Sequence, residues 1–183
     1  MLALWIILGI IVLLVLWFIG VYNSLVQLRN KVRNQFSQID VQLKRRFDLI
    51  PNLVETVKGY AKHESETFEK VIAARSSYAS ATTDSEKIDA ANQMTQAVRG
   101  LLAIAEAYPE LKANTNFMSL QNDLKETEEK ISYARQFYND SVMVYNNKIQ
   151  VIPSNIVAGI AGFKAEKLFE AGEQERENVK VEF

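Results

Sequence analysis

Three closely spaced glutamates, Glu126, Glu128 and Glu129, are the first candidates for chemistry, because paired carboxylates can act as a general acid and a general base. Residues three apart share a face of a helix, so Glu126 and Glu129 would lie together. Lys125 and Lys130 flank them, however, and opposite charges at these spacings form ion pairs on exposed helix surfaces. We therefore predict a solvated, ion-paired helix face here and no catalytic site.

The single histidine, His63, precedes Glu64 and Glu66 and is the natural starting point for a metal site. A zinc site needs further nitrogen or sulfur ligands at helical spacing, and the sequence contains no cysteine. A carboxylate-rich site for a hard cation would be the remaining possibility. We predict instead a surface or partly packed histidine. The sequence also contains no nucleophile elbow, phosphate-binding loop or His-Glu-x-x-His pattern. It therefore predicts no enzymatic activity, no metal, no cofactor and no small-molecule substrate.

Basic residues cluster at Lys44, Arg45 and Arg46, after a second basic group in residues 29–33. One reading is a topology signal on a solvated face. The other is binding, because basic residues beside a membrane each contribute about 1 kcal/mol of attraction to anionic headgroups. On an upright helix, Lys44 would lie about 30 Å or more from the membrane edge, beyond the range of charge screening. Only residues 29–33 would then reach lipid, and Lys44, Arg45 and Arg46 would be free to bind a protein partner or an acidic segment of another copy.

An apolar segment rich in small residues follows Pro153 and places Ile156, Ile160 and Phe163 on one side. Together with Ile152, these residues are the strongest candidate for an interaction surface, because exposed apolar patches usually mark interactions. Three roles are open. The segment could cover the open end of a helical bundle, form a subunit interface through its small residues, or dip into the membrane surface.

Residues 2–22 are almost wholly apolar and contain no charged side chain. A run of about 20 apolar residues is long enough to cross a hydrocarbon core of roughly 30 Å. Trp5 lies near one end, and Trp17 and Tyr22 lie near the other, as expected of interfacial aromatics. A cleaved signal peptide is the alternative. It would need a positive start, a shorter apolar core and a small-residue cleavage site, and the run has none of these. We predict a transmembrane anchor in contact with lipid.

Charge sets the expected orientation and excludes one class of partner. Basic residues follow the apolar run and none precedes it, so the positive-inside rule places the N-terminus outside and the rest of the chain in the cytosol. The net charge of −1 excludes a globally basic nucleic-acid-binding protein. The lack of cysteine excludes disulfides and thiol nucleophiles.

The remaining apolar spacing predicts an all-α fold, in which the anchor continues into an antiparallel bundle of three to four long helices. The first helix runs on from the anchor to Pro51, which we expect to open a second helix ending near Ser80. Thr83 and Glu86 have capping-box spacing and should start a third. A further helix is predicted over residues 115–150. Its three-four alternation of core positions is Phe117, Leu120, Leu124, Thr127, Ile131, Ala134, Tyr138, Ser141, Tyr145 and Lys148, with Phe137, Val142, Val144 and Ile149 widening the stripe.

Several long stretches resemble the LemA family of bacterial membrane proteins. They include YNSLVQLRNKV at residues 22–32, DVQLKRRFDLIPNLVETVKGYAKHE at 40–64, YPELKAN at 108–114, NFMSLQNDLKETEEKISYARQFYND at 116–140 and YNNKIQVIPSNIVAG at 145–159. The resemblance implies a bacterial cell (inner) membrane protein with a single anchor, residues 1–22. A helical bundle, residues 23–150, and a short apolar segment with a charged tail, residues 151–183, would follow it. It implies no reaction and no catalytic residues.

Two functions fit these features. The first is a non-enzymatic, self-associating helical scaffold, which the long first helix, the imperfect heptads and the apolar segment after Pro153 favour. This protein would be a homo-oligomer. The second is an adaptor or regulator that docks onto another membrane protein, such as a protease or a transporter.

Overall fold

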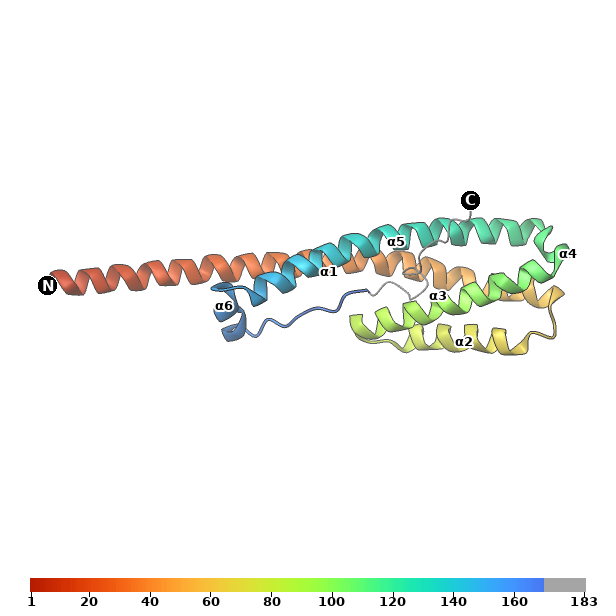
Figure 1. The fold of residues 1–183 in the computed structure, drawn as a ribbon, viewed down its shortest axis with the longest axis horizontal. Coiled ribbons are helices and arrows are strands. Elements are labelled where there is room, and N and C mark those ends of the chain that lie inside the picture. Colours follow the sequence, from red (N-terminus) through yellow and green to blue (C-terminus); the bar gives the residue numbers. More distant parts are fainter. Residues whose placement is uncertain (170–183) are drawn as a thin grey trace, which may run out of the picture. The chain divides into compact units, whose positions relative to one another are not determined.

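The structure is a computed structural model, and it describes residues 1–169 of the chain. Over this range the chain forms helices joined by short connections, with no strand, which confirms the all-α prediction. The part of the predicted charged tail beyond residue 169 lies outside this range. The helices, coloured in chain order in Figure 1, are α1 (Leu2–Tyr60), α2 (Ser65–Ser80), α3 (Asp84–Ala107), α4 (Pro109–Lys112), α5 (Thr115–Gln150) and α6 (Ser154–Ile160).

The chain divides by its internal packing into two compact units. Unit 1 consists of residues 1–37 and 136–168, and therefore contains the first part of α1, the last part of α5 and α6. Unit 2 consists of residues 38–135 and Phe169, and contains the rest of α1 and α5 with α2, α3 and α4. The predicted boundaries at residues 22 and 150 followed changes in sequence character, whereas this division follows packing.

The core of unit 2 is formed by the apolar faces of α1, α2, α3 and α5, with Leu111 from α4. On α2 and α3 the apolar residues at helical spacing are buried, namely Phe68, Val71, Ile88, Ala91, Met94, Val98, Leu101 and Ala105. Each helix has one apolar face, so packing several such faces together removes them from water. The largest apolar side chains in this core include Ile50, Leu53, Val57, Phe68, Val71, Met94, Leu101, Leu111, Phe117 and Leu124.

Helix α1 continues through Pro51, which corrects the prediction that a new helix starts there. A proline inside a helix removes one backbone hydrogen bond and usually kinks or breaks the helix. Here Ile50, Leu53 and Val54 are buried in the same core on either side of the proline, and this packing offsets the lost bond. The chain leaves the helix only after Tyr60, and α2 then runs from Ser65 to Ser80, the end that the sequence predicted.

The capping box predicted for α3 is present. The Thr83 side chain accepts a hydrogen bond from the Glu86 backbone N–H, and the Glu86 carboxylate accepts from the backbone N–H groups of Thr82 and Thr83. Hydrogen bonds to a carboxylate favour its charged form. The backbone bonds from Thr82 and Thr83, followed by the Thr82 hydroxyl, lower the pKa of Glu86 from 4.5 to about 2.

The capping box should make stability depend on pH in the acid range. Because the folded pKa of Glu86 is lowered, its contribution is complete above 4.5 and is lost as the pH falls toward about 2. We expect Glu86→Gln to flatten the loss of thermal stability over this window, measured by circular dichroism melts of the detergent-solubilised protein. Glu129→Gln, which removes an exposed carboxylate on α5, should leave the wild-type slope. An unchanged slope in Glu86→Gln would contradict this account.

Helix α5 has the predicted bounds, and each of its ten predicted core positions is buried or half-buried. Two of the buried positions are polar, Thr127 and Ser141. Their hydroxyls donate to the backbone carbonyls four residues earlier, at 2.7 Å and 2.9 Å respectively, so their burial leaves no unpaired donor. The Asn114 side chain accepts from the Phe117 backbone N–H at 3.0 Å and caps the start of the helix.

Unit 1 is held together by side chains of α5 that bind the chain after α6. The Asn146 side-chain amide exchanges two hydrogen bonds with the Glu166 backbone, both 2.9 Å long. The hydroxyls of Tyr138 and Tyr145 donate to backbone carbonyls of the same extended segment, at 2.8 Å and 2.9 Å. Burial, followed by the nearby Glu166 carboxylate, raises the pKa of Tyr145, so this hydroxyl stays protonated and able to donate. The segment after α6 is therefore fixed against α5.

Candidate interaction surfaces

Arg46 is buried, with 1% of its surface exposed. The prediction that it is free to bind a partner is therefore wrong. Its Nη1 atom donates to Thr95 Oγ1 and to Glu128 Oε1, both at 2.8 Å, and its Nη2 atom donates to the Ala91 carbonyl at 2.9 Å. The guanidinium thus joins α1, α3 and α5 inside unit 2. Charged groups are tolerated in protein interiors when they are paired and hydrogen-bonded in this way.

Lys44 and Arg45 are exposed, as the prediction requires. The Arg45 Nη2 atom lies 3.8 Å from Asp123 Oδ1 and 3.7 Å from Glu126 Oε2, and Lys44 Nζ lies 3.5 Å from Asp48 Oδ2. Such exposed ion pairs contribute at most about 1 kcal/mol. These two cations could therefore exchange their present carboxylates for those of a partner.

The local ion pair predicted for the glutamates is present at Glu126. Glu126 pairs with Lys130, and the hydrogen bond and charge of Lys130, with the charge of Arg45, lower the pKa of the Glu126 carboxyl. Glu128 instead pairs with the buried Arg46. His63 is exposed. Within residues 1–169, no group of three or more histidine, aspartate or glutamate side chains is arranged to hold a metal ion.

A polar cluster that the sequence did not predict joins α1, α2 and α3. Asp40 accepts a hydrogen bond from the Tyr78 hydroxyl at 2.9 Å and pairs with Lys87 Nζ, which lies 3.0 Å from both carboxylate oxygens. Burial, followed by the Asp40 hydrogen bond and charge, raises the pKa of Tyr78, which keeps its hydroxyl protonated. The three residues are far apart in sequence, and no local spacing relates them. These hydrogen bonds connect α1, α2 and α3 within unit 2, and the three side chains serve as partners for one another.

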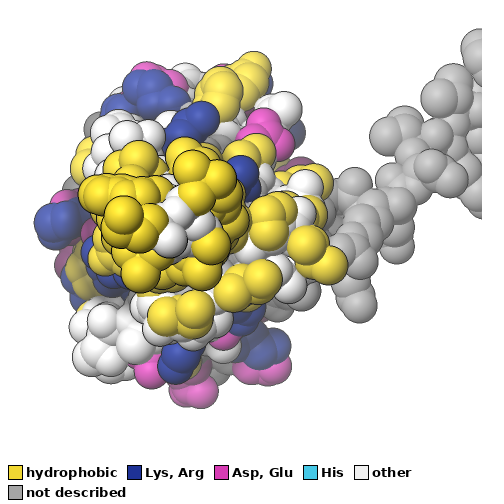
Figure 2. Space-filling view, turned by 90° about the vertical axis from the view of Figure 1, so that its left-hand side faces the viewer, with side chains coloured by type: hydrophobic (Ala, Val, Ile, Leu, Met, Phe, Trp, Pro, Cys, Tyr) yellow, Lys and Arg dark blue, Asp and Glu magenta, His cyan; other side chains and the backbone are white. Residues whose placement is uncertain are grey.

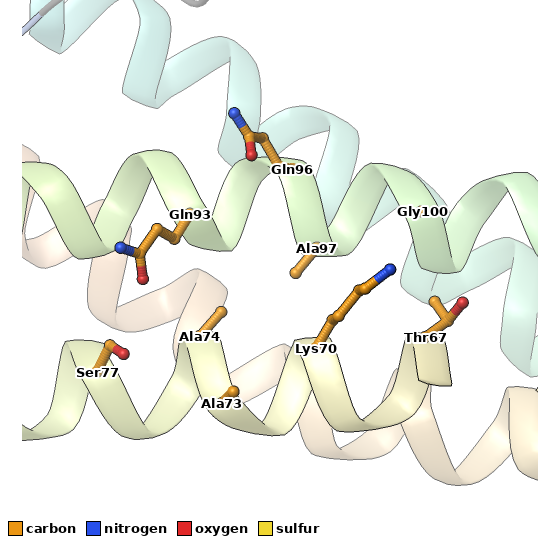
Figure 3. A pocket seen from close by; sticks show the side chains of 9 residues that line it. All are labelled: Thr67, Lys70, Ala73, Ala74, Ser77, Gln93, Gln96, Ala97 and Gly100. Carbon is orange, nitrogen blue, oxygen red and sulfur yellow. The ribbon is translucent and has the colours of Figure 1, made fainter. Parts of the chain in front are cut away.

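A shallow groove of about 450 Å³ runs between α2 and α3 in unit 2. Figure 3 shows the side chains along it, which come from both helices. Its lining is mostly small or uncharged, with one lysine. The lining residues are Thr67, Lys70, Ala73, Ala74, Ser77, Gln93, Gln96, Ala97 and Gly100.

Helix α6 packs onto α1 through two of its residues. Val157 and Ala158 are buried against Leu25, and Phe18 and Val21 pack at the edge of the same cluster. The Ser154 hydroxyl donates to the backbone carbonyls of Lys148 and Val151 at the C-terminal end of α5. One face of the apolar segment after Pro153 therefore covers part of α1 within unit 1.

The opposite face of α6 and the turn before it remain exposed. Ile152 is 83% exposed, Ile156 56% and Ile160 71%. Phe163, the fourth predicted residue, is half-buried, because its ring packs edge-on against Tyr22 with 5.8 Å between centroids. The Arg29 guanidinium lies 4.9 Å from the Phe163 ring centroid on its face. Three of the four residues are thus available to a partner.

A second exposed apolar stripe lies in unit 1 on the last part of α5 and on Val151, the residue directly after it. Phe137 and Val144 were predicted to widen the buried stripe, but they are 60% and 56% exposed. Val151 is 43% exposed, and its N–H donates to the Asn147 carbonyl at 3.0 Å, which keeps it in the helical register. Phe137, Val144 and Val151 are seven residues apart and share one face, with Asp140 and Asn147 between them. We call these five residues the α5 seam.

Within residues 1–169, α1 is the one helix with a segment long and apolar enough to cross a membrane, and this segment is its first part. Its apolar run contains no buried residue, and Phe18 and Val21 are half-buried, whereas a core helix of similar hydrophobicity would be mostly buried. Figure 2 faces the N-terminal end of the chain and shows hydrophobic side chains gathered there. The fold therefore defines an all-helical protein with one exposed, apolar N-terminal helix.

Comparison with known proteins identifies the family. The LemA family model matches residues 35–183, and the chain therefore belongs to the LemA family. A Protein LemA of Metamycoplasma hominis is 27% identical over 163 residues, which cover 88% of this chain and 74% of the relative. Family membership and the apolar helix together fit a membrane-associated protein.

More distant relatives are named magnetosome proteins. Magnetosome protein MamQ 2 of Paramagnetospirillum magneticum is 25% identical over 175 residues. Magnetosome protein MamQ of Magnetospirillum gryphiswaldense is 24% identical over 174 residues. Each match covers 81% of this chain but 64% of the relative, so the chain spans less than two thirds of the length of the magnetosome relatives.

Proposed function

We propose that this protein is a non-enzymatic, single-pass protein of the bacterial cell membrane that acts as a self-associating helical scaffold. The exposed apolar run of α1 supports the anchor. The basic residues that follow the run support an N-terminus outside and the remainder of the chain in the cytosol. The partners that the proposal requires are lipid and further copies of the chain.

The α5 seam is the observation that carries the proposal. Its apolar residues repeat every seven positions on a face turned away from the buried stripe of α5, which suits pairing with another helix. Copies anchored in one membrane are parallel, so each seam residue can meet its own counterpart. Confinement to the membrane raises the effective concentration of these copies. Asp140 and Asn147 between the three apolar positions would fix the register of this contact.

The seam can be tested by measuring the mass of the intact protein. We expect the wild-type chain, extracted in mild detergent, to form a discrete oligomer by size-exclusion chromatography with light scattering. Val144→Glu should shift it toward monomer. Each Val144 that leaves the seam loses about 1.5 kcal/mol of burial, and a dimer contains two. The association constant should therefore fall by about 100-fold or more.

Met143→Glu is the matched control, because Met143 is adjacent and similarly exposed but lies off the seam. It should leave the mass unchanged. A monomeric wild-type protein would contradict self-association. A monomer would favour the second function, an adaptor for another membrane protein. Crosslinking in membranes would then identify the protein that it binds.

A further inference from the structure

We infer that α6 and the turn before it are seated in the membrane surface, with Ile152, Ile156 and Ile160 at the boundary between headgroups and acyl chains. The partner is a bilayer that contains anionic phospholipid. This inference rests on the proposed function to the extent that the first part of α1 must cross that bilayer.

The packing of α6 places it at the edge of the proposed span. Its buried residues, Val157 and Ala158, contact Leu25, with Phe18 and Val21 in the same cluster. Phe18 and Val21 belong to the apolar run itself, and Leu25 lies three residues beyond Tyr22, or about 4.5 Å along the helix. Helix α6 and the span lie in the same compact unit. A membrane that covers the span therefore ends beside α6.

The exposed isoleucines continue the apolar surface of the span. Ile152, Ile156 and Ile160 keep more than half of their surface in contact with solvent, although the neighbouring Val157 and Ala158 are buried. A helix whose inner face packs on protein and whose outer face is apolar is completed by an apolar medium on that side. At the membrane edge, that medium is lipid.

The charge of unit 1 suits anionic headgroups. Residues 141–165 contain no aspartate or glutamate, and Lys148 and Lys164 flank α6 on either side. Across residues 1–37 and 136–168 the cations are Arg29, Lys31, Arg33, Lys148, Lys164 and Lys167, against the carboxylates Asp140 and Glu166. Basic residues beside an apolar insertion strengthen binding to anionic lipid.

Depth-dependent quenching in vesicles tests the inference on the full chain. Because the chain has no cysteine, single-cysteine variants can carry one fluorophore each. Ile160→Cys reports on α6, Ile11→Cys on the span, and Val41→Cys on an exposed apolar position of α1 in unit 2. The labelled proteins are reconstituted into vesicles of phosphatidylcholine and phosphatidylglycerol that contain lipids spin-labelled either near the headgroup or deep in the acyl chain.

We expect the Ile160→Cys probe to be quenched more by the shallow label than by the deep label, at a depth of about 5–10 Å. The Ile11→Cys probe should be quenched more by the deep label, and the Val41→Cys probe by neither. Replacing Lys148 and Lys164 with glutamine should reduce quenching of the Ile160→Cys probe in phosphatidylglycerol vesicles and leave it unchanged in pure phosphatidylcholine.

The outcomes separate this inference from the proposed function. Loss of quenching at Ile11→Cys would overturn the anchor, and the inference with it. Deep quenching at Ile11→Cys without quenching at Ile160→Cys would leave the anchor standing and overturn the inference. Shielding of the Ile160→Cys probe from aqueous iodide without lipid quenching would assign this face to a second copy of the chain, and would also overturn it. Unchanged circular dichroism confirms that each variant is folded.

Discussion

Replacing Arg46 with alanine is expected to lower the free energy of unfolding of the protein by about 3 kcal/mol. The variant loses three short hydrogen bonds from a charged donor, each of which contributes roughly 1.5–3 kcal/mol. The sum is smaller than that range implies, because Glu128 is 36% exposed and water can solvate it once the guanidinium is gone. Urea unfolding of the solubilised protein, followed by circular dichroism, measures the change.

The adjacent arginine provides the control. Arg45 has the same charge and lies on the same helix, but its ion pairs are long and exposed. Arg45→Ala should therefore change the free energy of unfolding by at most about 1 kcal/mol. Equal effects of the two substitutions would mean that Arg46 does not join the helices of unit 2 as the structure indicates.

Phe117→Ala is expected to have a still larger effect, lowering the free energy of unfolding by about 3–5 kcal/mol. The Phe117 ring is 1% exposed and packs in the core of unit 2 with Leu111 and Leu124. Removing it takes away buried apolar surface and leaves a cavity that the helices around it cannot fill completely. The same urea titration measures this loss.

Met118 is the matched position for this test, since it follows Phe117 on α5 but is 42% exposed. Met118→Ala should change the free energy of unfolding by about 0.5 kcal/mol or less. A small effect of Phe117→Ala would show that the core of unit 2 is not packed as described.

The parts of the fold that sequence reasoning predicted are those determined by local spacing. Helix α5 was predicted with its bounds, because its core positions alternate by three and four without interruption. The start of α3 followed from Thr83 and Glu86, whose capping box is a contact between near neighbours. In both cases the residues that determine the element lie within it.

The errors arose where distant packing outweighed a local rule. A proline normally ends or kinks a helix, but residues on both sides of Pro51 pack into the core of unit 2 and hold α1 together there. Arg46 was expected at the surface as part of the basic cluster with Lys44 and Arg45, and arginine is in general rarely buried. Its three partners lie 45, 49 and 82 residues away. One signal was present, because Arg46 shares the helical face of the buried Leu43 and Ile50.

The candidate surfaces followed the same pattern. Sequence spacing identified the apolar segment after Pro153, and the structure leaves Ile152, Ile156 and Ile160 exposed. Sequence spacing did not distinguish the exposed Phe137 and Val144 from the buried Val142 and the half-buried Ile149, because the width of a buried stripe depends on what packs against it. The α5 seam therefore emerged only from the three-dimensional structure.

Disulfide crosslinking at the α5 seam, in membranes from cells expressing the protein, tests the scaffold proposal most directly. The chain has no cysteine of its own, so any disulfide between two copies of the chain arises from the residue introduced. If copies pair in parallel through the seam, Val144→Cys will form a covalent dimer on mild oxidation, and Met143→Cys, one residue away and off the seam, will not. Equal crosslinking at both positions, or none at Val144→Cys, would contradict self-association through this face.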